Sequence, residues 1–114
     1  MKKNYIDNKV FYEEIKKWRM SCLEAENQGE ELPRIPEYLG ECFLKIANHL
    51  SYRPNFINYT YREEMILDGI ENCIQYAHNF DHEKYNNPFG YFTQIVFYAF
   101  VRRIQKEKKQ QHIK

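Results

Sequence analysis

The sequence predicts an all-α fold, a small domain of four helices. Apolar residues recur at helical spacing over most of the 114 positions, and only four Gly and four Pro residues interrupt them. Aromatic residues make up 17% of the chain, which favours a globule with large core side chains over a disordered chain. We expect residues 1–35 to form an N-terminal helix with a Pro-containing linker, and residues 36–114 to form the main helical domain.

The first helix is expected from about Asn8 to Asn27. Asp7 or Asn8 suits its cap, and Gly29 suits its end. Its apolar face consists of Val10, Phe11, Ile15, Trp18 and Cys22. The following stretch, "EELPRIPEY", is a linker because two prolines break the helical pattern.

The second helix is expected from about Glu37 to Leu50. Pro36 suits the first helical position, and Pro54 lies beyond the end. Its apolar stripe consists of Leu39, Phe43, Ile46, Ala47 and Leu50.

The third helix is expected to open at Thr60 and to run to about His78. Thr60 and Glu63 have the spacing of a capping box. The expected buried stripe is Ile66, Ile70, Cys73, Ile74 and Ala77. The expected exposed side is acidic and consists of Glu63, Glu64, Asp68 and Glu71.

The fourth helix is expected from Asn87, as cap, and Pro88, as first residue, to about Lys109. Seven of the seventeen residues from Lys84 to Phe100 are aromatic, and the apolar positions cover far more than one helix face. One interpretation is a central helix enclosed by the other three. The other is a nucleic-acid surface, because three rings lie beside basic groups that suit stacked bases and phosphates. These residues are Tyr91, Phe92, Tyr98, Arg102, Arg103 and Lys106.

The charge is divided between the two ends of the chain. Residues 1–83 carry 10 Lys and Arg against 15 Asp and Glu, whereas residues 84–114 carry seven Lys and Arg against Glu107 alone. The basic end is a candidate surface for a polyanion, since clustered cations attract phosphates. A solvated helix end that complements the helix dipole explains the same charges.

Several function classes lack support in the sequence. No apolar run approaches the roughly 20 residues of a membrane span, and the first residues lack a signal-peptide core, so we expect a cytoplasmic protein without a membrane partner. Cys22, Cys42 and Cys73 suit reduced core thiols. Cys73, His78 and His82 lack a fourth ligand for zinc. Without a phosphate loop or a nucleophile elbow, we expect no enzyme activity, metal or cofactor.

Two adjoining segments carry a family resemblance. The segment "EEMILDGIENCIQYAHNFD", residues 63–81, resembles the second conserved region of bacterial RNA polymerase sigma factors. The segment "KYNNPFGYFTQIVFYAFVRRIQKEKK", residues 84–109, is most similar to the late-transcription sigma factors of large tailed bacteriophages. The resemblance covers about residues 55–109 and implies a four-helix domain like sigma region two. It also implies a host-cell cytoplasmic location if the chain is phage-encoded.

The resemblance implies two partners. In sigma factors, the acidic side of the helix before Phe-Asp docks on the clamp helices of the largest subunit of core RNA polymerase. The implied docking set here is Glu64, Leu67, Asp68, Ile70 and Ile74. An acidic face with apolar neighbours suits a helical partner, since charges set orientation and apolar groups supply contact.

The second implied partner is the non-template strand of the A/T-rich minus-ten promoter element. By the resemblance, Phe92 stacks on a flipped adenine, with Phe89 and Tyr91 close by, and the basic residues after Tyr98 meet the upstream duplex. The implied DNA-binding set is Phe89, Tyr91, Phe92, Tyr98, Arg102, Arg103 and Lys106. Ile95 and Val96 occupy the positions of the tryptophan pair with which housekeeping sigma factors wedge the melted edge.

Two further hypotheses stay open. A small adaptor or decoy occupies the polymerase clamp without delivering DNA. A nonspecific basic nucleic-acid binder binds free DNA with a steep salt dependence and ignores polymerase.

Overall fold

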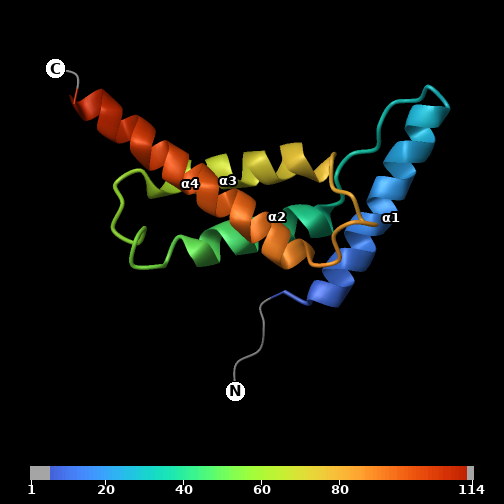
Figure 1. Ribbon diagram of the computed structural model, residues 1–114, viewed down its shortest axis with the longest axis horizontal. Helices are drawn as coiled ribbons and strands as arrows, with labels where there is room; N and C mark the ends of the chain where they lie inside the picture. Colours follow the sequence, from blue (N-terminus) through green and yellow to red (C-terminus); the bar gives the residue numbers. More distant parts are fainter. Residues whose placement is uncertain (1–5, 113–114) are drawn as a thin grey trace.

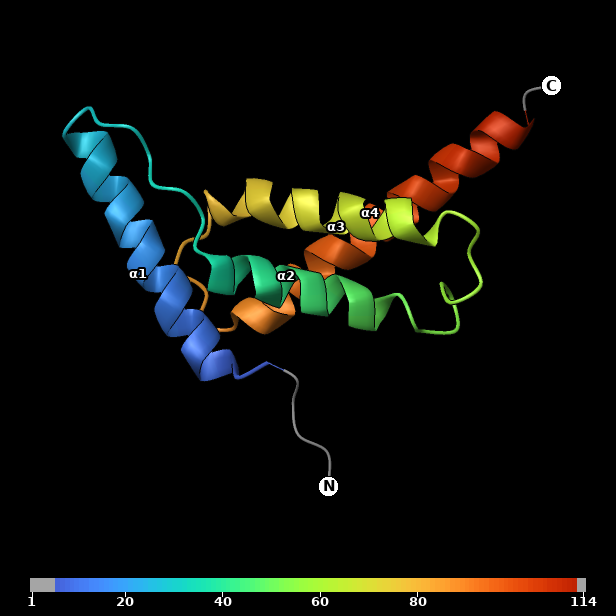
Figure 2. The same cartoon turned by 180° about the vertical axis from the view of Figure 1, so that it is seen from behind.

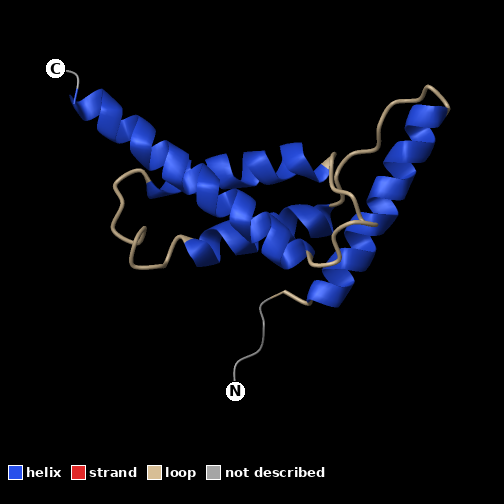
Figure 3. Ribbon diagram, viewed as in Figure 1, coloured by secondary structure: helices blue, strands red, loops and turns tan. Residues whose placement is uncertain are grey.

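The computed structural model describes residues 6–112 and shows an all-α domain, without a strand in that part of the chain (Figures 1 and 3). The helices are α1 (Asn8–Asn27), α2 (Glu37–Leu50), α3 (Arg62–Ala77) and α4 (Pro88–His112). Helices α2 and α3 lie side by side, α4 crosses both, and α1 stands across one end (Figures 1 and 2). The C-terminal part of α4 extends beyond the bundle in both views.

Local signals determine where α1 and α2 begin and end, as expected. The Asp7 carboxylate accepts hydrogen bonds from the backbone N–H groups of Lys9 and Val10, at 3.0 and 3.3 Å, and caps α1. Gly29 takes a φ of +69° after α1, a conformation that glycine adopts without a steric penalty. Pro36, expected as the first helical residue, lies just before α2 in an extended conformation, and its side chain makes no capping bond.

The start of α3 differs from the expected one. Tyr61 is the cap residue, its side chain makes no capping bond, and no Thr60–Glu63 capping box forms. The loop before α3 is held instead by Phe56, whose buried ring packs on Phe97 and Phe100 of α4 at 5.9 and 5.2 Å between centroids. Tertiary packing therefore overrides the local capping signal.

The start of α4 is confirmed. The Asn87 side chain accepts a hydrogen bond from the Gly90 N–H at 3.1 Å, and Pro88 is the first helical residue. The helix runs to His112, three residues further than expected.

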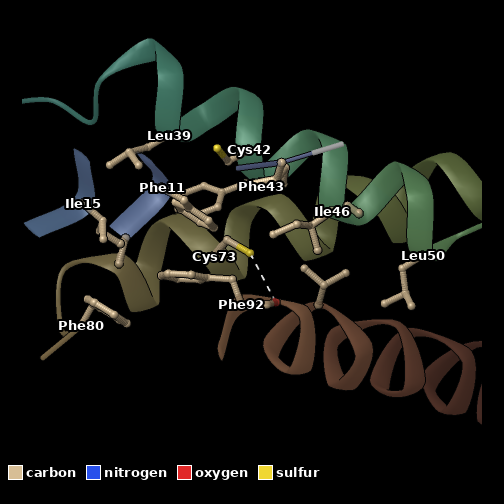
Figure 4. Packing of buried hydrophobic residues seen from close by; sticks show 14 of the residues in the cluster. Phe11, Ile15, Leu39, Cys42, Phe43, Ile46, Leu50, Cys73, Phe80 and Phe92 are labelled. Carbon is tan, nitrogen blue, oxygen red and sulfur yellow. Dashed lines mark hydrogen bonds between the residues drawn. The ribbon is translucent and has the colours of Figure 1, made fainter. Parts of the chain in front are cut away.

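One buried core joins all four helices (Figure 4). Helix α1 contributes Phe11, Ile15 and Trp18, each less than 5% exposed, to the same cluster as the residues of α2, α3 and α4. The expected division at residue 35 is therefore not a division of the hydrophobic core.

The buried stripe of α3 is rotated from the expected one. The buried residues are Met65, Gly69, Cys73 and Ala77, whereas Ile66 and Ile70 are half-buried and Ile74 is 39% exposed. Gly69 explains the rotation, since a Cβ atom there would lie 3.1 Å from side-chain atoms of both Val96 and Phe100. The missing side chain lets α4 cross α3 closely at this point, and the expected stripe turns partly toward solvent.

Candidate protein and nucleic-acid interfaces

Phe92 is not available as a stacking platform. Its side chain is fully buried, with ring centroids of Phe43, Phe80 and Phe11 at 4.8, 5.8 and 5.9 Å (Figure 4). The Cys73 thiol donates to the Phe92 carbonyl at 4.0 Å. The prediction that this ring stacks on a base is therefore wrong for the folded chain, because α4 directs Phe92 to the centre of the bundle.

A hollow beside Tyr91 offers the accessible aromatic surface at the start of α4. The hollow has a volume of about 290 Å³ and is lined by Lys84, Tyr85, Asn86, Asn87, Tyr91 and Gln94. The Tyr85 and Tyr91 rings lie 4.9 Å apart, and Tyr85 is 37% exposed. Burial, with smaller effects of Tyr85 and Tyr76, raises the pKa of Tyr91, so its hydroxyl stays a neutral donor and acceptor. Rings, amides and one cation together suit an unpaired base with its phosphate.

The remaining positions at the start of α4 face the core to different extents. Phe89 is half-buried and packs against the core cluster, as does Ile95. Val96 is fully buried. Ile95 and Val96, which the resemblance places at the tryptophan-wedge positions, therefore pack against or within the core.

An exposed polar stripe follows the outer side of α4. Tyr98 is 52% exposed, and Arg102 and Lys106 follow at intervals of four residues, both exposed. Gln94 extends the stripe by one turn toward the start of α4, and Gln105 lies beside it. Because residues four apart share a helix face, the Tyr98 ring and the two cations point to the same side of α4.

Asp68 and Arg103, predicted for two different partners, bind each other. The Arg103 Nε and Nη2 atoms donate to the two Asp68 carboxylate oxygens at 2.6 and 3.1 Å, and Nη1 donates to Glu107 at 3.0 Å. The hydrogen bond to Asp68, assisted by that to Glu107, raises the pKa of Arg103. This two-pronged ion pair ties α3 to α4 and occupies most donors of the guanidinium group.

A second bridge lies one turn along the same helix crossing. Arg102 Nη2 donates to the Asn72 side-chain oxygen at 2.8 Å, and Asn72 in turn donates to the Asp68 carbonyl at 2.9 Å. An open hollow of about 500 Å³ lies here, with Lys106 at its border. Arg102 keeps an exposed side chain despite its bond, so this hollow has a cationic border.

The outer face of α3 combines exposed apolar and acidic side chains. Leu67 is 64% exposed and Ile74 is 39% exposed, and Glu64 and Glu71 alternate with them at helical spacing. Ile70 is half-buried at the edge of this face. Two large aliphatic side chains of α3 are therefore exposed to water on this face.

The residues predicted to bind polymerase thus lie on two different sides of α3. Glu64, Leu67 and Ile74 lie on the outer face, whereas Asp68 lies at the crossing with α4. Sequence reasoning missed Tyr85, Gln94 and the other polar residues of the hollow. The signal for Tyr85 was present, since it is one of the seven rings between positions 84 and 100.

The described residues offer neither a metal site nor a membrane-spanning helix. Among residues 6–108, whose side chains the structure describes, no three His, Cys, Asp or Glu side chains gather closely enough to hold a metal ion. Among the described helices, none combines the length and apolar content that a membrane crossing needs. No protein-family model and no curated protein sequence matches this chain.

Proposed function

We propose that this chain is a specificity subunit of the sigma type, which binds core RNA polymerase through α3 and presents α4 to the minus-ten element of promoter DNA. The observation that carries the proposal is the pair of unlike exposed surfaces on neighbouring helices. The outer face of α3 is apolar and acidic, and the outer stripe of α4 is aromatic and basic. Two surfaces of this kind suit a protein partner and a nucleic-acid partner, respectively.

The protein-binding surface centres on Leu67. An exposed leucine flanked by carboxylates provides an apolar centre with a polar rim, an arrangement that fits a helical partner with basic groups at its edge. We leave Asp68 out of this surface because Arg103 satisfies its carboxylate within the chain.

The DNA-binding surface consists of the hollow beside Tyr91 and the outer stripe of α4. Tyr85 and Tyr91 provide rings for an unpaired base, and Tyr98, Arg102 and Lys106 continue toward the projecting end of the helix. Ring stacking returns roughly 1 to 3 kcal/mol per base, against a few kcal/mol for unstacking it from the duplex. The proposal therefore needs an opened or easily opened A/T-rich strand.

Matched surface variants test the protein-binding part. Leu67→Ser should weaken the binding of the labelled chain to core polymerase by at least about tenfold, since a central apolar contact is lost. Leu44→Ser is the control, because Leu44 of α2 is also half-exposed, at 50%. Equal affinities for the two variants would contradict the proposed surface.

A second candidate is a polymerase-binding adaptor that occupies the clamp without delivering DNA. The burial of Phe92 and the pairing of Arg103 favour it, because they remove two of seven predicted DNA contacts. Tyr85→Ala combined with Arg102→Gln separates the two candidates. If the chain is of the sigma type, the unmodified chain supports transcription from the promoter, and the double variant loses this activity while it still binds polymerase. If the chain is an adaptor, neither the unmodified chain nor the double variant supports transcription from the promoter.

A further inference from the structure

The segment between α3 and α4 carries part of the hollow but has no regular secondary structure. Lys84 and Tyr85 lie on a turn that Asp81 closes, since its carboxylate accepts from the Glu83 and Lys84 N–H groups at 3.0 and 3.3 Å. This turn is internally ordered, but no helix ladder fixes its position relative to α4. Its placement depends on the contact between the Tyr85 and Tyr91 rings, 4.9 Å apart, and on contacts from elsewhere in the chain.

Helix α1 supplies those contacts on both sides of the turn. Before and within it, Arg19 Nε donates to the Phe80 carbonyl at 3.1 Å, and the Tyr12 hydroxyl donates to the His82 carbonyl at 2.7 Å. After it, Asn8 Nδ2 donates to Asn87 Oδ1 at 2.8 Å. The three side chains project from one face of α1, at positions whose spacing matches that of the helix.

Asn8 differs from Tyr12 and Arg19 because its side chain makes hydrogen bonds to two residues at the start of α4. Its Oδ1 atom accepts a hydrogen bond from the Phe89 N–H at 3.0 Å, within the first turn of α4. Asn87, its other partner, also accepts from the Gly90 N–H. Gly90 permits this geometry, since a Cβ atom there would lie 2.8 Å from Asn87 Nδ2. One side chain of α1 therefore orients both the Asn87 amide and the start of α4.

We infer that α1 positions the hollow beside Tyr91 for its strand, with Asn8 as the principal positioning residue. The inference rests on the proposed function, because an unpaired base is the ligand it concerns. Asn8 does not line the hollow, so its effect on a bound base is indirect. It acts by fixing Asn87, which lines the hollow, relative to Tyr91 and Gln94 on α4.

Apolar anchors make α1 a rigid support for these contacts. Phe11 and Ile15 are fully buried, and Trp18 lies 4.9 Å from the His78 ring and donates to the Pro33 carbonyl at 3.2 Å. Because these side chains hold α1 without Asn8, Asn8→Ala should loosen the hollow while the helix stays docked. Trp18, the one tryptophan of the sequence, reports that docking by its fluorescence.

The first test needs neither polymerase nor DNA. Amide hydrogen exchange at Phe89 should be about fivefold faster in Asn8→Ala than in the unmodified chain, the ratio expected for one hydrogen bond of about 1 kcal/mol. Ser21→Ala is the control on α1, because the Ser21 hydroxyl is exposed and donates only within its own helix, to the Lys17 carbonyl. Unchanged exchange at Phe89 in Asn8→Ala would overturn the inference.

The second test uses the full chain bound to core polymerase and a single-stranded A/T-rich oligonucleotide with 2-aminopurine in place of one adenine. We expect quenching of the 2-aminopurine on binding, and about fivefold to tenfold weaker binding for Asn8→Ala with unchanged Trp18 emission and polymerase affinity. Tyr12→Phe should give a smaller loss in the same direction, and Ser21→Ala should give none. Quenching and affinity equal to the unmodified chain in both Asn8→Ala and Tyr12→Phe would refute the positioning role. An unmodified chain that gives no base-dependent quenching would instead refute the proposed function.

Discussion

Truncation of Phe92 separates a core role from a DNA-stacking role. The side chain is fully buried and has three phenylalanine rings from α1, α2 and the loop after α3 within 6 Å between centroids. Phe92→Ala removes a ring whose space the surrounding rings cannot fill. The variant therefore loses the free energy of burying the ring and also pays the cost of the cavity that remains. We expect the free energy of unfolding to fall by roughly 3 to 5 kcal/mol. This is a large share of the roughly 5 to 15 kcal/mol that stabilises a small domain.

Urea denaturation followed by far-ultraviolet circular dichroism measures this loss. Phe92→Leu keeps most of the volume and should lose only about 1 to 2 kcal/mol, which gives an ordered series even if the alanine variant is largely unfolded. Tyr98→Ala is the control on the same helix, with an expected change below about 1 kcal/mol because half of the side chain is exposed. A Phe92→Ala chain as stable as the Tyr98→Ala chain would refute the packing argument and restore Phe92 as a candidate base contact.

Three further predictions concern the helix crossing, the thiols and the basic stripe. A double-mutant cycle with Asp68→Asn and Arg103→Gln, measured by urea denaturation, should give a coupling free energy of about 1 kcal/mol, reduced by salt because both side chains are partly exposed. A coupling near zero would mean that the ion pair does not hold α3 to α4. Burial raises the pKa of Cys73, so the free energy of unfolding should fall as the pH rises above the ordinary thiol pKa of about 8.5, and a Cys73→Ala chain should lack this part of the pH dependence. In complexes with core polymerase, Arg102→Gln and Lys106→Gln should each make the negative slope of log affinity for single-stranded DNA against log salt shallower, by about 0.7. An unchanged slope for both variants would place the DNA elsewhere.

Helix positions were predictable where short-range signals determine them. The bounds of α1 and α2 match the expected ones because Asp7, Gly29 and Pro36 act within a few residues of themselves. Asn87 and Pro88 act in the same way at the start of α4. A capping pattern at Thr60 failed because the preceding loop is placed by long-range packing.

Which side of α3 and α4 is buried was less predictable. Apolar residues cover more than one face of α4, so spacing alone cannot distinguish Phe92, which is buried, from Tyr91, which lines a hollow. The answer depends on Phe11, 81 positions earlier in the chain. Gly69 has no side chain and contributes nothing to an apolar stripe, yet it determines where α4 crosses α3.

Contacts between polar residues far apart in sequence lay beyond prediction. Asp68 and Arg103 were expected on separate surfaces, and their hydrogen bond appears only when α3 and α4 cross. Asn8 gave no functional signal, because its partner Asn87 lies 79 residues away. Leu67 lay outside the expected buried stripe and is exposed, whereas Ile74 was expected in that stripe and is 39% exposed.

Transcription from a pre-opened template tests the central claim most directly. Core polymerase is supplied with a linear promoter whose A/T-rich minus-ten segment is unpaired by mismatches, so that no tryptophan wedge is required. Adding the chain should produce run-off transcripts from one start site, and changing the unpaired A/T segment to G/C should abolish them. Transcription that is the same with and without the bound chain, or indifferent to the sequence of the unpaired segment, would contradict the proposal that α3 grips the polymerase while α4 reads the opened strand.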